Sequence, residues 1–245
     1  MNILVVNGSP LGQKGNTYIL QEAFVRGATK ADAAVEEVFL NKKKIKPCLG
    51  CLTCWIKTPG KCIMNDDQSE IIEKCRWADT LVLATPLYVF GMTAQTKTFI
   101  DRLLPMSSPE FVLINGHCRH QPSGDRVQKF VLMSNCGFHE LDNFDALVMH
   151  CRQMCLNGGS EYLGHLLRPH GPLLSFPQVA PEAIKKVLDA VEKAGDEVVR
   201  TGKLSQSTMD AVSSELVPKE TYVEMGNAFW RSETEKAMAE RKQDE

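Results

Sequence analysis

The sequence lacks an excess of charge of either sign: 28 basic side chains face 30 acidic ones, and the formal net charge is -2. Proteins whose main partner is nucleic acid or an anionic membrane carry clustered basic charge, so we expect neither partner. No apolar stretch approaches the length of a membrane helix. The first apolar run, Ile3 to Val6, is too short for a signal peptide and follows no basic residue. These absences predict a cytoplasmic protein.

Cysteine, in contrast, is abundant. The chain has nine cysteines, although disulfides are uncommon in cytoplasmic proteins. Four of them lie between positions 48 and 62. This crowding favours a metal or redox role over a structural one.

Short apolar runs alternate with helical patterns along the first two-thirds of the chain, which predicts successive βαβ units around a parallel sheet. We expect strands at residues 3–6, 35–40, 80–84, 129–134 and 161–167, and helices at 17–30, 68–77, 93–103 and 142–156. The fold class is therefore α/β, with a doubly wound, five-stranded parallel sheet. Cys75, Cys151 and Cys155 fall on apolar helix faces and should be buried.

We assign residues 1–170 to the main domain, with a cysteine-rich insertion at 41–65 and a long loop without clear period at 105–126. Loops of that length in a domain are usually functional or mobile. Helices are also expected at 181–200, from 205 onward, and at 218–239, followed by a charged, frayed tail. Residues 171–245 thus form a helical extension, which either packs on the same subunit or reaches across a dimer.

The loop after the first strand reads Asn-Gly-Ser-Pro-Leu-Gly-Gln-Lys-Gly-Asn-Thr over residues 7–17. It joins a strand to a helix, so the free N–H groups of the helix start suit a phosphate. A P-loop would end in Gly-Lys-Ser/Thr, and a dinucleotide fingerprint would read G-x-G-x-x-G. Neither fits. A cradle for a terminal phosphomonoester remains, with a plain strand-to-helix turn as the alternative.

Gly-Ser-Pro-x-x-x-x-Gly-Asn-Thr in this position resembles the NADPH-dependent FMN reductase and iron–sulfur flavoprotein family. Two further segments agree with it: Thr-Pro-Leu-Tyr-Val-Phe-Gly at 85–91, followed by Ala-Gln-x-Lys-x-Phe-Ile-Asp-Arg, and Ser-Asn-Cys-Gly-Phe at 134–138. The resemblance implies a flavodoxin-like fold with bound FMN, whose ring is lined by the second and third segments. For Tyr88, ordinary loop packing is the alternative.

The resemblance implies the following FMN contacts: Ser9, Leu11, Gly15, Asn16, Thr17, Pro86, Leu87, Tyr88, Val89, Gly91, Ser134, Asn135, Cys136 and Gly137. Flavin carries the chemistry in such enzymes, so we expect no catalytic triad. We assign Cys136 no catalytic role.

The cysteine motif reads C-x2-C-x2-C-x7-C, at Cys48, Cys51, Cys54 and Cys62. This is iron–sulfur-type spacing, although Ile63 stands where a bacterial ferredoxin motif has proline. The motif resembles the compact motif that holds a [4Fe-4S] cluster in iron–sulfur flavoproteins. Zn²⁺ binding, a redox C-x-x-C pair and free thiols remain as alternatives.

Two functions follow. In the first, NAD(P)H reduces FMN, which passes electrons to a quinone, azo, nitro or similar small acceptor. In the second, an electron carrier takes single electrons from ferredoxin through a [4Fe-4S] cluster. A non-enzymatic binding module is a third reading that no residue favours. Family likeness implies a homodimer or homotetramer.

Overall fold

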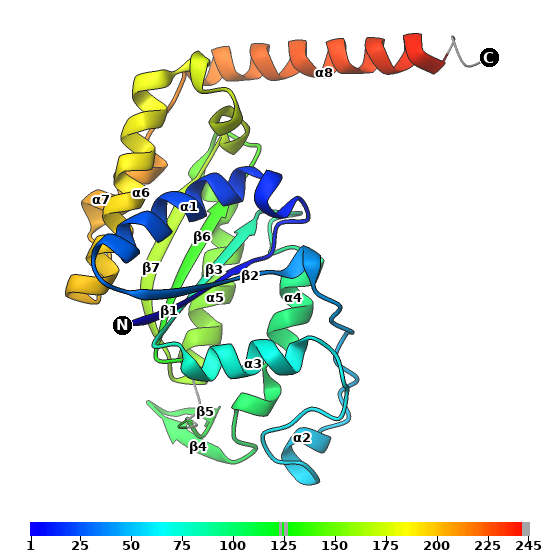
Figure 1. Ribbon diagram of the computed structural model, residues 1–245, viewed down its shortest axis with the longest axis vertical. Coiled ribbons are helices and arrows are strands. Elements are labelled where there is room, and N and C mark those ends of the chain that lie inside the picture. The colour runs from blue at the N-terminus through cyan, green and yellow to red at the C-terminus, as the bar shows by residue number, and fades with distance from the viewer. Residues whose placement is uncertain (123, 125–126, 242–245) are drawn as a thin grey trace.

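The computed structural model describes residues 1–122, 124 and 127–241. Its main sheet has five parallel strands in the order β2-β1-β3-β6-β7 (Figure 1). They are β1 (Asn2–Asn7), β2 (Ala34–Phe39), β3 (Thr80–Pro86), β6 (Lys129–Asn135) and β7 (Glu161–Arg168). The predicted doubly wound, flavodoxin-like fold is confirmed.

Helices cover both faces of the sheet (Figure 1). On one face lie α1 (Asn16–Lys30), α6 (Pro181–Thr201) and α7 (Gln206–Ser213), and on the other α3 (Gln68–Trp77), α4 (Ala94–Asp101) and α5 (Asp145–Gly158). Along β1, Ile3 and Val5 enter the first core cluster, whereas Leu4 and Val6 enter the second. This period of two explains why a strand buried on both sides reads as a continuous apolar run. The predicted burial of Cys75, Cys151 and Cys155 is confirmed.

Helices α1 and α6 approach until their backbones touch. A Cβ on Gly27 would lie 1.8 Å from the carbonyl oxygen of Glu192, and one on Gly195 would lie 2.2 Å from that of Phe24. The extension therefore packs on the main domain through α6, and apolar residues of α6 and α7 complete its core.

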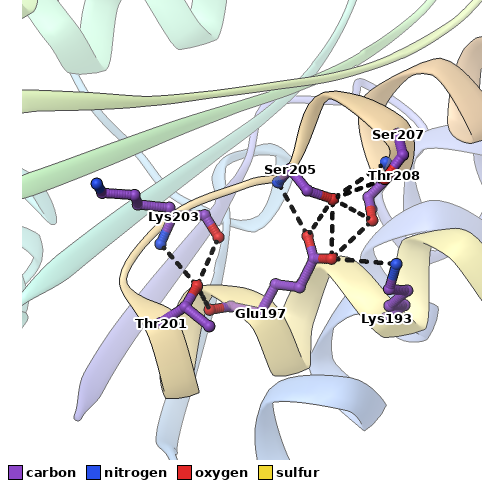
Figure 2. Close-up of polar contacts among 7 residues, drawn as sticks. All are labelled: Lys193, Glu197, Thr201, Lys203, Ser205, Ser207 and Thr208. Atoms are coloured by element: carbon purple, nitrogen blue, oxygen red, sulfur yellow. Dashed lines mark hydrogen bonds and ion pairs between the residues drawn. The ribbon is translucent and has the colours of Figure 1, made fainter.

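The junction between α6 and α7 is fixed by a carboxylate. Figure 2 shows Glu197 of α6 accepting hydrogen bonds from Ser205 and Thr208 at the start of α7, and pairing with Lys193. The Ser205 N–H and the Thr208 hydroxyl lie 3.0 and 2.9 Å from its oxygens. Burial alone would raise the pKa of Glu197, but these hydrogen bonds lower it. The Ser205 side chain caps α7 by accepting from the Thr208 N–H at 3.3 Å, and Glu197 fixes this capping residue to α6.

The prediction of a structureless loop at 105–126 is wrong for part of that segment, which contains an antiparallel hairpin of β4 (Phe111–Ile114) and β5 (His117–His120). Asn115 and Gly116 form its turn with φ of 52° and 77°. Asn-Gly is the dipeptide that two-residue hairpin turns favour, and our sequence reading missed it. Residues 123, 125 and 126 of the predicted loop lie outside the described residues.

Helix α8 (Lys219–Arg241) extends away from the rest of the molecule (Figure 1) and buries none of its residues. The domain boundary at residue 170 and the reach of residues 171–245 across a dimer stay predictions. The tail at 242–245 lies outside the described residues. Within residues 1–122, 124 and 127–241, no helix is both long and apolar enough to cross a membrane.

Candidate functional site

The three loops singled out in the sequence follow β1, β3 and β6, at the carboxyl edge of the sheet. The N–H of Gly8 donates to the carbonyl of Ala84 at 2.8 Å, which joins the first loop to β3. The side-chain amide of Asn135 donates to the Thr17 hydroxyl at 2.7 Å, which joins β6 to α1. Open α/β sheets bind ligands at this edge, so the bonded loops form the candidate FMN site.

The loop after β1 is shaped by Asn7, whose side chain is buried. Its Oδ1 accepts from the N–H of Ser9 at 2.8 Å, and its Nδ2 donates to Gln21 at 2.6 Å. A Cβ on Gly15 would lie 2.7 Å from the Ser9 hydroxyl, so the loop closes tightly there. Helix α1 then starts at Asn16, and the first N–H groups of a helix have no acceptor within it. This arrangement suits a phosphate.

The predicted phosphate contacts differ in their exposure. Ser9 and Thr17 are buried, whereas Leu11 is exposed. The side chain of Asn16 accepts a hydrogen bond from Ser175, beyond β7. Gln21 was not among the predicted residues, because a single glutamine inside a helix carries no recognisable signal.

The second loop contains a strained turn. Tyr88 and Gly91 exchange two backbone hydrogen bonds of 2.9 and 3.0 Å. Between them, Val89 and Phe90 adopt positive φ of 48° and 60°. This conformation is an outlier for a β-branched residue and costs about 1–3 kcal/mol per residue. Such strain concentrates at ligand sites, and Val89 is 96% exposed, so the contact of this turn with the flavin ring stays a prediction.

The third loop is bonded to the second and to α8. The carbonyl of Asn135 accepts from the N–H of Leu87 at 2.8 Å, beside Pro86. The carbonyl of Gly137 accepts from the hydroxyl of Tyr222 at 2.6 Å. The sequence reading missed Tyr222, because nothing in its surroundings points to a loop 85 residues earlier.

Aromatic rings connect the second and third loops, and the cysteine of the third loop is buried. Phe90 and Phe138, both exposed, stack with centroids 6.3 Å apart and planes 11° apart. The thiol of Cys136 is buried, and burial raises its pKa, which fits a packing role. The hydroxyl of Ser134 is buried and has no hydrogen-bond partner among the described residues.

The cysteine motif lies in the insertion, in which α2 (Thr53–Ile56) is a single short helix. One small pocket is lined by all four motif cysteines, Cys48, Cys51, Cys54 and Cys62. Cys48 and Cys51 are exposed, and Cys54 is buried. Within the described ranges, no group of three or more His, Cys, Asp or Glu side chains, the four motif cysteines included, is arranged to hold a metal ion. Zn²⁺ would need four ligands about 2.0–2.3 Å from one point, whereas a cluster spreads its thiolates over several irons.

Comparison with known sequences finds matches over about half of this chain. A family model described as NADPH-dependent FMN reductase matches residues 1–130. An iron–sulfur flavoprotein of Archaeoglobus fulgidus is 38% identical over 105 residues, 43% of this chain and 46% of that protein. One of Methanocaldococcus jannaschii is 35% identical over 106 residues, 43% of this chain and 53% of that protein. The chain spans about half the length of the curated relatives it matches.

Solved structures resemble the chain over more of its length. An FMN-dependent NADH-azoreductase from Bacillus anthracis, in complex with FMN, superposes with a TM-score of 0.61 at 16% identity, over 81% of this chain and 99% of that one. An NAD(P)H:quinone oxidoreductase from Methanothermobacter marburgensis gives 0.57 at 16%, over 80% and 94%. At such identities the likeness shows the fold alone.

Proposed function

The chain belongs to the NADPH-dependent FMN reductase family, and we propose that it is an FMN-dependent oxidoreductase that uses NAD(P)H to reduce a small acceptor. The acceptor would be a quinone, an azo or nitro compound, or a similar small molecule. An azoreductase and a quinone oxidoreductase share its fold, which supports this class.

The observation that carries the proposal is the joining of three loops at one sheet edge. These loops would hold FMN, which would supply hydride and electron transfer. The N–H groups at the start of α1 would hold its phosphate, and Gly15 would allow the loop to close around it. The strained turn at Val89 and Phe90 would present backbone groups to the flavin ring. The exposed Phe138, which stacks on Phe90, would lie beside that ring.

The deciding experiment is the visible spectrum of the purified protein, followed by anaerobic mixing with NADH or NADPH. We expect bound FMN that loses its oxidised absorbance with at least one of the two nucleotides, and reoxidation by menadione. FMN that neither nucleotide reduces would exclude the oxidoreductase. Absence of any flavin after incubation with excess FMN would favour a binding module instead.

The four motif cysteines favour a second candidate function, an electron carrier of the iron–sulfur flavoprotein type. Their thiols share one pocket, and two relatives carry that name. In this candidate a [4Fe-4S] centre on these cysteines would receive single electrons from ferredoxin. Anaerobic purification should then yield about four iron and four sulfide per chain. Stoichiometric zinc, or no metal after reconstitution, would exclude the carrier.

We further propose a homodimer or homotetramer. Helix α8 projects from the body and exposes Val223, Phe229 and Trp230. Light scattering of the full chain and of a Trp230→Glu variant tests this proposal. A monomeric full chain would contradict it.

A further inference from the structure

Arg102, directly after α4, forms hydrogen bonds to residues at both ends of the cysteine-rich segment. Its guanidinium is 1% exposed. It forms a two-pronged ion pair with Asp66, with N–O distances of 2.9 and 3.0 Å. It also donates to the carbonyl of Lys46 at 2.6 Å. Lys46 and Asp66 flank the four motif cysteines in sequence, so one arginine from outside the insertion holds both of its ends.

The same guanidinium also faces the thiols. Its Nη2 donates to the sulfur of Cys62 at 3.5 Å. Arg102 lines the pocket that all four motif cysteines line. Its third nitrogen, Nε, is buried and has no acceptor among the described residues. A buried donor without a partner is costly, and in a native protein it calls for an acceptor that side chains and backbone do not supply.

We propose that Arg102 is a positioning residue for an iron–sulfur centre on the four cysteines, orienting Cys62 and offering Nε–H to a sulfur atom of that centre. The inference rests on the second proposed function. Two observations indicate that these residues fit such a centre. The Nε of Arg102 has no acceptor in the described part of the chain, and Arg102 lines the same pocket as the four cysteines. Hydrogen bonds and positive charge at the sulfur atoms stabilise the reduced, more negative form, and so raise the reduction potential.

Arg102 could also act only by holding the two ends of the insertion together, without donating to the centre. Variants separate these two roles. Asp66→Asn weakens the ion pair that holds the insertion but keeps the guanidinium. Arg102→Lys keeps the charge but loses Nε and the fork. Lys61→Gln removes an exposed positive charge next to Cys62 in sequence, and controls for charge alone. Each protein is reconstituted anaerobically, and iron content, iron loss to a chelator and midpoint potential are measured.

We expect both Arg102→Lys and Asp66→Asn to lose iron faster than the parent. Only Arg102→Lys should also shift the midpoint potential of the retained centre to more negative values, with Lys61→Gln unchanged. An unshifted potential in Arg102→Lys, or an equal shift in Lys61→Gln, would overturn the donor role while leaving the carrier function standing. A parent chain that binds no iron–sulfur centre would overturn both.

A measurement on the unaltered sequence covers the case in which Arg102 variants do not fold. The protein is produced with ¹⁵N-guanidino arginine, reconstituted and reduced, and examined by pulsed electron paramagnetic resonance. We expect a ¹⁵N coupling to the reduced centre, because Arg102 is the arginine that lines the pocket. Absence of the coupling would overturn the inference.

Discussion

The hydroxyl of Tyr222, in the first turn of α8, donates a 2.6 Å hydrogen bond to the carbonyl of Gly137, 85 residues earlier. Its ring also lies 5.6 Å from that of His170, which stacks on His139 with centroids 4.6 Å apart. The start of α8 lies outside the residues that the family model matches, yet it holds the loop after β6. The C-terminal extension therefore contributes to the candidate FMN site.

We expect Tyr222→Phe to weaken FMN binding about two- to tenfold, because the net contribution of one hydrogen bond is about 0.5–1.5 kcal/mol. Titrating the apoprotein with FMN and following flavin fluorescence measures this. Tyr162→Phe is the matched control, since it removes a hydroxyl 3.2 Å from His165 near the amino end of β7. Equal weakening in both variants would show that Tyr222 acts only through general stability.

We expect Gly27→Ala to lower the free energy of unfolding by about 1–3 kcal/mol, the usual cost of overpacking. The new Cβ would lie 1.8 Å from a backbone oxygen of α6, so the two helices must separate. Gly226→Ala in α8 is the control, because a Cβ there meets nothing within 4 Å. Urea unfolding of both variants measures the difference, and an unchanged Gly27→Ala would contradict the close contact.

The order of strands and helices could be predicted from the sequence because apolar runs and helical periods are local. The loop at 7–17 and the segments near Pro86 and Asn135 were recognisable for the same reason: each is a short, contiguous motif. The hairpin at Asn115-Gly116 was equally local and was missed because the surrounding segment was read as one irregular loop.

The hydrogen-bond partners within the two candidate sites could not be predicted, because the bonded residues are distant in sequence. Arg102 lies 36 residues from Asp66, and Tyr222 lies 85 from Gly137. Neither pair shares a helix or a strand, so no periodicity links its members. The left-handed backbone at Val89 is also invisible in the sequence, since valine normally avoids that conformation.

We expect the stability to fall as the pH drops below about 6.5, the ordinary pKa of histidine. His170 is 1% exposed, and burial, with Arg168 and His139 nearby, lowers its pKa to about 3. Between these values the unfolded chain binds a proton that the folded chain excludes. Each unit of acidification therefore costs about 1.4 kcal/mol of unfolding free energy.

His170→Asn should flatten this dependence between about pH 4.5 and 6.5. Asparagine tolerates the positive φ of 42° at this position and does not titrate. Its shorter side chain loses the hydrogen bond from the Leu216 N–H to Nε2 (3.0 Å), so the variant should be less stable overall, and the slope with pH is the quantity compared. His150→Asn, at an exposed position in α5, is the control and should keep the parental slope. Urea unfolding at a series of pH values measures all three, and a parental slope in His170→Asn would contradict the assignment.

The nine cysteines should divide by exposure when the folded, metal-free chain reacts with a thiol reagent at about pH 8. Cys48, Cys51 and Cys118 are exposed and should react first. Burial raises the pKa of Cys75, Cys151 and Cys155 to about 12, so these three should react only after unfolding. Denaturant should release all nine. Mass spectrometry of the alkylated peptides assigns each site.

Anaerobic iron–sulfur reconstitution should then protect Cys48 and Cys51 but not Cys118. Cys118 lies in β5, outside the four-cysteine motif, and is also exposed, so it serves as an internal control within the same sample. Protection has a direct physical cause, because a thiolate bound to iron is no longer a free nucleophile. If Cys48 and Cys51 stay as reactive as Cys118 in protein that has retained iron, the metal is held elsewhere and the four-cysteine assignment is wrong.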